Sequence, residues 1–203
     1  MKNPESLRLL LVRHGESTAN AAEIYANRDT ALSDKGHQQA MRIARRLSRY
    51  KIDKIIISTY TRAKQTAEHI INHHKHAEII YDKDAREHEL GVFEGKRKGT
   101  MEEHAIKKGI PIIEYRPQGG ESIIDLRERA RRFLDKYRKE RGTILIIAHG
   151  TFIKALLQVI LEFPDDIHHR YGHDNASLTI VDLNEKKLKL LNCTKHLKEM
   201  KEK

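Results

Sequence analysis

Two histidines and two arginines stand where they could bind and attack a phosphoryl group. Arg13-His14-Gly15 follows the apolar run 7–12, Arg62 follows a second apolar run, and His149-Gly150 follows a third. A guanidinium binds two phosphate oxygens at once, and an imidazole can act as a nucleophile or a proton donor. Opposite unit charges about 4 Å apart attract by about 4 kcal/mol at an effective dielectric of about 20. Several converging cations could therefore bind a phosphate dianion without a metal ion.

These residues meet only if the apolar runs are parallel strands of one sheet. Residues 7–12, 52–58 and 143–148 are short apolar runs, which are typical of buried parallel strands. Ligands of such sheets bind beyond the carboxyl ends of the strands. We therefore expect three polar strand ends to face one crevice, whereas an antiparallel arrangement would place them at opposite ends.

Helical patterns separate the strands, so we predict one α/β domain over residues 1–203, a three-layer sandwich with a mostly parallel central sheet flanked by helices. Ser33 can cap a helix whose apolar residues recur at helical spacing up to Leu47. Residues 85–120 are rich in Gly and Pro and are predicted to be mostly loop, and the tail from Lys195 is expected to fray. The other predicted elements are helices beginning near Thr61, Ser122 and Thr151, the last ended by Pro164, a short helix at 101–108, and strands at 78–81, 177–183 and 187–192.

Composition narrows the class of protein. The 203 residues carry 39 Lys and Arg against 29 Asp and Glu, a net charge of +10, but the basic residues are scattered among acidic ones. There is no Trp and no nucleic-acid-binding fingerprint, so we expect no nucleic-acid partner. Apolar runs far shorter than about 20 residues predict no membrane partner. The single cysteine, Cys193, and the lack of an apolar leader favour the cytoplasm. We expect a monomer or homodimer.

Metal binding is the first alternative for a chain with 13 histidines. No His-Glu-x-x-His helix or paired cysteines occur, and the cluster His73-His74-Lys75-His76 stands among charges at a predicted helix end. We expect that cluster to be solvated and the protein to hold no metal.

The segment Leu11-Val12-Arg13-His14-Gly15-Glu16-Ser17, with Asn20 after it, resembles the signature of the histidine phosphatase superfamily, the phosphoglycerate mutase-like proteins. The resemblance runs from about residue 8 to 197 and is closest to the small phosphatases. Its further motifs, in order, are 32–36 with Gln39-Ala40, 58–67, Arg86 to Gly91 with Glu94-Gly95, Gly120-Glu121-Ser122 with Arg129, Ala148-His149-Gly150, and Asn175-Ala176-Ser177.

The resemblance implies a covalent mechanism. His14 would attack phosphorus and become a phosphohistidine, while its other ring nitrogen donates to a backbone carbonyl. Gly15 would leave room for the close approach. Glu87 would be the general acid and base, because it precedes Gly91 by four residues as the family's acid does. Glu89 is the rival for this role.

The same resemblance implies a phosphate-binding set. Arg13, Arg62 and His149 would surround the phosphoryl oxygens, with Gly150 beside them. Asn20 would add a neutral donor, although Asn20, like Glu121 and Asn175, also fits a turn or cap.

The substrate stays open at this point. We expect a small phosphorylated metabolite, hydrolysed with no cofactor. The alternative is a phosphoglycerate mutase interconverting 2- and 3-phosphoglycerate, with 2,3-bisphosphoglycerate as phosphoryl donor, although the long insertion typical of those mutases is missing before Gly119. A non-catalytic phosphate binder is disfavoured because binding needs neither His14 nor Glu87. Five outer basic residues could recognise a second anionic group: Arg28, Lys96, Arg97, Lys98 and Arg116.

Overall fold

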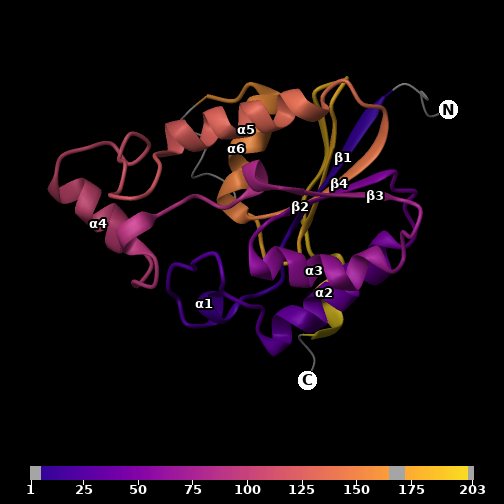
Figure 1. The fold of residues 1–203 in the computed structure, drawn as a ribbon, viewed down its shortest axis with the longest axis horizontal. Coiled ribbons are helices and arrows are strands. Elements are labelled where there is room, and N and C mark those ends of the chain that lie inside the picture. The colour runs from indigo at the N-terminus through magenta and orange to yellow at the C-terminus, as the bar shows by residue number, and fades with distance from the viewer. Residues whose placement is uncertain (1–5, 165–171, 201–203) are drawn as a thin grey trace.

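A central sheet with helices on both faces forms the body of the molecule (Figure 1). The computed structural model describes residues 6–164 and 172–200. Within them the sheet has six strands in the order β3-β2-β4-β1-β5-β6. The strands are β1 (Leu7–Arg13), β2 (Lys54–Ser58), β3 (Glu78–Asp82), β4 (Gly142–Ala148), β5 (Leu178–Asp182) and β6 (Lys187–Cys193).

The first four strands of the chain are parallel to one another, as the mostly parallel prediction requires. β1 pairs in parallel with β4, which pairs with β2, which pairs with β3, whereas β5 and β6 pair antiparallel. The central strand β1 is buried on both faces because Leu7 to Val12 is almost wholly apolar. The carboxyl ends of β1, β2 and β4 therefore lie at one edge of the sheet.

Two helices cover each face, which confirms the three-layer arrangement. α2 (Asp34–Leu47) and α3 (Thr61–Ile71) pack on one face, and α5 (Ile123–Tyr137) and α6 (Gly150–Leu161) on the other. Alternate residues of each strand point to opposite faces, so the sheet contributes to two separate apolar cores. Leu10 and Ile147 belong to the core under α2 and α3, whereas Leu11 and Ile146 belong to the core under α5 and α6.

Residues 86–120, which we term the outer segment, extend away from the sheet (Figure 1). They contain α4 (Thr100–Lys107), close to the predicted 101–108, and the short 3-10 helix η2 (Gly91–Phe93). The outer segment has a small apolar cluster of its own, made by Leu90, Phe93, Met101, Ala105 and Tyr115. The prediction of mostly loop with one short helix is thus confirmed, and the small apolar cluster packs this segment together.

Other elements differ from the predictions. A one-turn helix α1 (Thr18–Ala21), capped by Ser17, was not predicted, and η1 (Lys83–Ala85) follows β3. α6 ends at Leu161, before Pro164, because Glu162 adopts a left-handed φ of 55°. The start of the tail does not fray: Lys195–Met200 forms the 3-10 helix η4, which packs against α2. Its side chains find apolar and hydrogen-bonding partners that the sequence did not reveal.

The His73–His76 cluster is solvated only in part. His73 and His76 are exposed, but His74 is 2% exposed, and burial lowers the pKa of its ring. The prediction of a solvated cluster was therefore wrong for His74, which turns inward at the end of α3.

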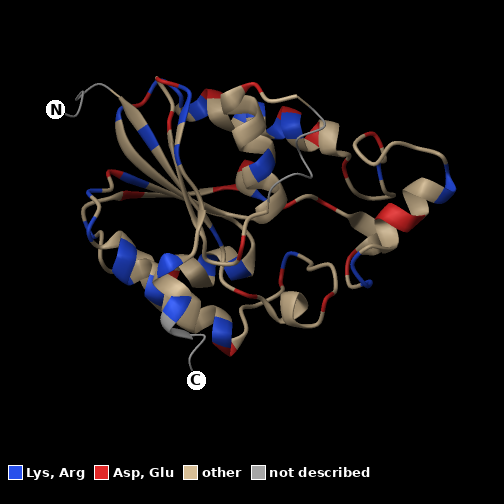
Figure 2. Cartoon of the chain, turned by 180° about the vertical axis from the view of Figure 1, so that it is seen from behind, with Lys and Arg blue, Asp and Glu red and all other residues tan. Residues whose placement is uncertain are grey.

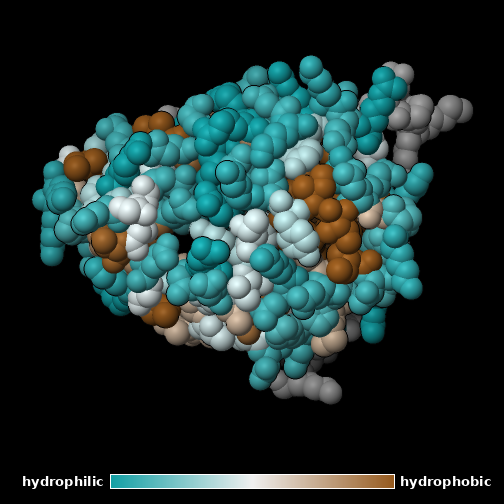
Figure 3. All heavy atoms as spheres, viewed as in Figure 1, coloured by the Kyte–Doolittle hydropathy of each residue, from teal (hydrophilic) through white to brown (hydrophobic). Residues whose placement is uncertain are grey.

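Basic residues are spread over α2, α3 and α5, and each of these helices also carries at least one acidic residue (Figure 2). The face seen in Figure 3 is mainly hydrophilic, with an apolar patch near the β3 edge, where Ile79 is 42% exposed. Among the described residues, no helix is long and apolar enough to span a lipid bilayer.

Candidate active site

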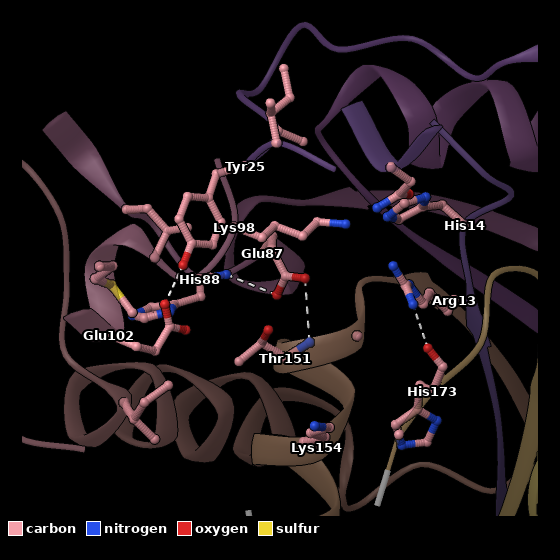
Figure 4. A pocket seen from close by; sticks show the side chains of 18 of the residues that line it. Arg13, His14, Tyr25, Glu87, His88, Lys98, Glu102, Thr151, Lys154 and His173 are labelled. Atoms are coloured by element: carbon pink, nitrogen blue, oxygen red, sulfur yellow. Dashed lines mark hydrogen bonds between the residues drawn. The ribbon is translucent and has the colours of Figure 1, made fainter. Parts of the chain in front are cut away.

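A cavity of about 400 Å³ opens at the carboxyl ends of the parallel strands. It lies between the sheet, the N-terminus of α6 and the outer segment, and Figure 4 shows side chains of all three pointing into it. Six of the residues predicted for the site line it: Arg13, His14, Asn20, Arg62, Glu87 and Gly150. The cavity therefore lies where we expected the site, beyond the carboxyl ends of the parallel strands.

His14 is held as a neutral ring whose Nε2 lone pair is directed at Arg62. Its Nδ1 lies 2.6 Å from the carbonyl oxygen of Gly15, which can only accept, so the proton is on Nδ1. Nε2 accepts from Nε of Arg62 at 3.2 Å. Burial, and then the positive charges of Arg62 and Arg13, lower the pKa of His14 well below its ordinary value. An unprotonated Nε2 is the form that a nucleophile needs.

The two arginines are fixed by backbone carbonyls as well. Arg62 is 2% exposed, donates to the carbonyl of Asn27 at 2.7 Å and stacks over Tyr60. Arg13 donates from Nη1 to the carbonyl of His173, and its Nε has no partner among the described residues. Each guanidinium is therefore oriented in advance with N–H groups left for a ligand.

His149 lies beside His14, with ring centroids 5.1 Å apart, although its side chain does not line the cavity. Its Nε2 is 2.8 Å from the hydroxyl of Ser58, and its buried Nδ1 has no hydrogen-bond partner among the described residues. Burial, Arg62 and His14 lower the pKa of His149 well below its ordinary value. When Ser58 donates to Nε2, Nδ1 carries the proton and is a buried donor beside His14.

The geometry separates Glu87 from its rival Glu89. The Glu87 carboxylate accepts the backbone N–H groups of Thr151 and Phe152, at 3.3 and 3.1 Å, where α6 begins. It faces the cavity opposite His14 and Arg13 (Figure 4). Glu89 is absent from the lining and pairs with Arg86 at 3.2 Å. Of these two carboxylates, Glu87 is thus the one that lines the cavity.

Arg129 holds the loop that carries Glu87. It is 3% exposed and donates to the carbonyls of Arg86 and Glu87, at 2.7 and 2.9 Å, and to that of Asp84. It also pairs with Glu121. Glu121 is therefore a partner of Arg129, not a turn or cap residue, and this pair fixes the backbone on which Glu87 stands.

The loop after β1 is organised by two asparagines. The Oδ1 of Asn20 accepts from the backbone N–H of Ser17, which leaves its amide nitrogen as the donor at the cavity. Asn175 donates at 3.2 Å to the carbonyls of both His14 and Gly15. Asn20 also completes the α1 cap, which confirms the cap interpretation, while its role as a donor to substrate stays a prediction.

Gly15 permits a close approach of two backbone segments. A Cβ at this position would lie 2.4 Å from the carbonyl oxygen of Gly36 in the first turn of α2. Its N–H donates to Thr66 of α3 at 3.1 Å. Gly15 does not line the cavity, so contact with α2 and α3 explains it without invoking a ligand.

The remaining lining of the cavity is mixed in character. Lys98 and Lys154 bring further positive charge. Tyr25 hydrogen-bonds to Glu102 at the far end of the cavity, away from His14 (Figure 4). The apolar wall, as we term it, consists of Ile24, Ala26, Leu90, Met101, Ile112 and Ile123. The cavity can therefore take a phosphoryl group at one end and an apolar group at the other.

Of the five outer basic residues, only Lys98 lines this cavity. Arg28 and Arg97 pair with Asp29 and Glu103, and Arg116 pairs with Asp125 at 2.6 Å. Lys96 lies over the ring of Phe93. The expectation that the other four face the substrate was wrong, because acidic or aromatic neighbours on the surface bind them.

Sequence reasoning missed Thr151 and Lys154 of α6. Lys154 stands four residues after Gly150, so the i, i+4 spacing from the helix start could have indicated it, whereas Thr151 follows Gly150 directly. The apolar wall gave no such signal, because its members come from five separate stretches of sequence. Among the described residues, no group of three or more His, Cys, Asp or Glu could hold a metal ion.

Comparisons with protein families, curated sequences and solved structures all lead to the same family and fold. The sequence model of the histidine phosphatase superfamily (branch 1) matches residues 9–195. "Probable phosphoglycerate mutase GpmB" of Erwinia tasmaniensis is 32% identical over 185 residues, 87% of the chain and 85% of that protein. The alpha-ribazole phosphatase of Shigella flexneri is 25% identical with a TM-score of 0.79, covering 92% of this chain and 96% of that one. Bacillus stearothermophilus YhfR is 29% identical with a TM-score of 0.79, covering 95% and 100%.

Proposed function

Because the chain belongs to the histidine phosphatase superfamily, a family of phosphatases and mutases, we propose that it is a phosphomonoesterase that forms a phosphohistidine on His14. The observation that carries the proposal is the neutral, buried Nε2 of His14 beside two buried guanidinium groups. A site for binding alone would not need an unprotonated nucleophile.

In the first step, Nε2 of His14 forms a bond to phosphorus while the bond from phosphorus to the ester oxygen breaks. Glu87 gives its proton to that oxygen, so the alcohol leaves neutral. Arg13, Arg62 and His149 hold the phosphoryl oxygens, whose negative charge persists throughout the transfer.

In the second step, water attacks the phosphohistidine. Glu87 accepts the proton of the water, the nitrogen–phosphorus bond breaks, and its electron pair returns to Nε2 of His14. Phosphate leaves, and no cofactor is consumed. In this proposal the charge is balanced by the chain's own cations, so activity should not depend on an added metal ion.

For the substrate we propose a small phosphorylated metabolite whose alcohol part has an apolar surface. The apolar wall supports this choice, because burying apolar area favours binding by about 25 cal/mol per Å². Glu102 at the far end would repel a second anionic group placed there. Lys98 is the single outer cation left to recognise one nearer the phosphate.

The relative named as a phosphoglycerate mutase supports a second candidate, the interconversion of 2- and 3-phosphoglycerate. In that case the phosphohistidine would be formed from 2,3-bisphosphoglycerate and would pass its phosphoryl group to a phosphoglycerate instead of to water.

One assay separates the two candidates. The purified protein is incubated with p-nitrophenyl phosphate and, separately, with 3-phosphoglycerate, and both free phosphate and isomerised ester are measured. We expect free phosphate, unaffected by a chelator, and an acid-labile phosphoryl adduct on His14 after rapid quench. Isomer without free phosphate would favour the mutase. Turnover that survives His14→Ala would overturn both.

A further inference from the structure

We infer that the C-terminal 3-10 helix η4 holds the loop of the nucleophile in place through His196, which acts as a positioning residue for His14. The inference rests on the proposed function, because it concerns the same nucleophile. His196 does not line the cavity, so any effect on the reaction must pass through the residues that it contacts.

η4 is anchored to the body of the protein. Leu197 packs, partly buried, against the apolar core under α2 and α3, which also contains Val12 and Leu178. Arg46 of α2 donates to the sulfur and the carbonyl oxygen of Cys193, at 3.2 and 3.4 Å. The start of the tail is therefore fixed to α2 and β6.

His196 bridges two partners that determine which of its ring nitrogens carries the proton. Its Nε2 is 3.0 Å from the carbonyl oxygen of Ala176, and its Nδ1 is 3.0 Å from Nη1 of Arg46. The carbonyl can only accept and the guanidinium can only donate, so the proton is on Nε2. Burial and the charge of Arg46 lower the pKa of His196 to about 4, which keeps this neutral form at pH 7.

Ala176 connects His196 to the loop of the nucleophile. Ala176 is fully buried and has a left-handed φ of 54°, a conformation that costs an L-residue about 1 kcal/mol. Its N–H donates at 3.0 Å to the carbonyls of both Arg13 and His14. One backbone group of Ala176 thus contacts His196 and the other contacts the nucleophile loop.

The adjacent Asn175 strengthens the link. Its amide donates to the carbonyl of Gly15, the same oxygen that accepts the Nδ1 proton of His14. A shift of the Asn175-Ala176 turn would therefore move the acceptor that sets the tautomer and direction of the His14 ring.

Loss of the His196 side chain leaves the Ala176 carbonyl without its side-chain donor and frees the strained turn to relax. Misplacing a catalytic group by about 1 Å can cost about 100-fold in rate. For His196→Ala we expect a partial misplacement, with kcat lower by about 10-fold and KM changed by less than about 3-fold. The 15N resonances of the His14 ring should shift as well.

The decisive comparison is between His196→Ala and His196→Gln. The glutamine amide can donate to Ala176 through nitrogen and accept from Arg46 through oxygen, so it should restore most of kcat. His69→Ala is the matched control, because His69 is another half-buried histidine bonded to a neighbouring helix, at His37. All four proteins are assayed with p-nitrophenyl phosphate well below their melting temperatures.

Wild-type kcat and unshifted His14 resonances in His196→Ala would overturn the inference. Equal losses in His196→Ala and His69→Ala, in proportion to their melting temperatures, would reduce His196 to a structural residue and overturn it too. Should His196→Ala fail to fold, Arg46→Gln takes its place, and we expect kcat to fall by about 3-fold. An unchanged kcat in that variant would contradict the inference. If the wild type hydrolyses no phosphomonoester, the proposed function fails, whereas the His14 resonances still decide this inference.

Discussion

The Nε–H of Arg62 donates to Nε2 of His14 at 3.2 Å, and both side chains are almost fully buried. The nitrogen that we propose as nucleophile is therefore hydrogen-bonded to a cation. In the mechanism that we propose, this lone pair forms the bond to phosphorus, so the hydrogen bond between the two side chains breaks. The Nε–H of Arg62 is then free to make a charge-assisted hydrogen bond to a phosphoryl oxygen.

Replacing Arg62 by methionine should lower kcat/KM by about 100-fold to 1,000-fold, the usual loss when one preorganised donor to developing charge is removed. Steady-state hydrolysis of p-nitrophenyl phosphate measures it. Arg28→Met is the control, because the Arg28 side chain is 77% exposed and lies outside the cavity. Equal behaviour of the two variants would contradict the role given to Arg62.

Glu87→Gln should lower kcat by about 100-fold to 10,000-fold, because glutamine can neither give nor take a proton. The loss should be largest for alkyl phosphates, whose alcohols are poor leaving groups, and smaller for p-nitrophenyl phosphate. Glu89→Gln removes a carboxylate that pairs with Arg86 outside the cavity, so its kcat should stay within about 3-fold of the wild type. The reverse order of effects would make Glu89 the acid.

Gly15→Ala should destabilise the protein by about 1–3 kcal/mol, because the new methyl group meets the carbonyl of Gly36 at 2.4 Å and both segments are backbone. Urea unfolding measures the free energy. Gly172→Ala is the matched control, since a Cβ there has open space and should change stability by no more than about 1 kcal/mol. An unperturbed Gly15→Ala would show that α2 can move away from the loop.

Stability should fall as the pH drops below about 6.5, the ordinary value for an unfolded histidine. Burial lowers the pKa of His14 and His149, and that of His173 to about 4, so the unfolded chain binds protons first. Protons bound by the unfolded state favour it, and the loss continues between about pH 6.5 and pH 4. Melting temperatures across this window test the sign.

A variant that removes one of these rings gives the control for pH. His173→Gln cannot titrate, so its melting temperature should fall less between pH 6.5 and 4, by at least about 3 °C. Parallel pH curves for the variant and the wild type would assign the acid sensitivity to other groups.

The sequence was sufficient for the parts of the fold that follow simple periodicity. The apolar runs before His14 and His149 predicted the parallel strands, and strand-end logic then placed both histidines together. Glu87 could be preferred over Glu89 only through a family resemblance, since both are carboxylates in one loop. The distinction is physical: only Glu87 reaches the N-terminus of α6.

What could not be predicted depends on contacts between distant segments. Leu197 and His196 contact partners from α2 and from the turn at Ala176. No local sequence pattern predicts these contacts. Ion pairs at the surface likewise determine where the outer basic side chains point, since Arg116 pairs with Asp125, nine residues further along the chain. Net charge and spacing do not predict which acidic residue a long basic side chain will pair with.

The outer segment, with its own small apolar cluster, has an evolutionary consequence. It contributes Leu90, Met101 and Ile112 to one half of the cavity, while strand ends and α6 supply the other half. Glu87, the proposed acid, stands at the very start of this segment and is held by α6 and Arg129. In the function that we propose, the residues beyond Glu87 that contact the alcohol can therefore be changed by mutation or insertion while the groups that act on the ester stay in place. A lineage with this arrangement could acquire new metabolites and keep one chemical step.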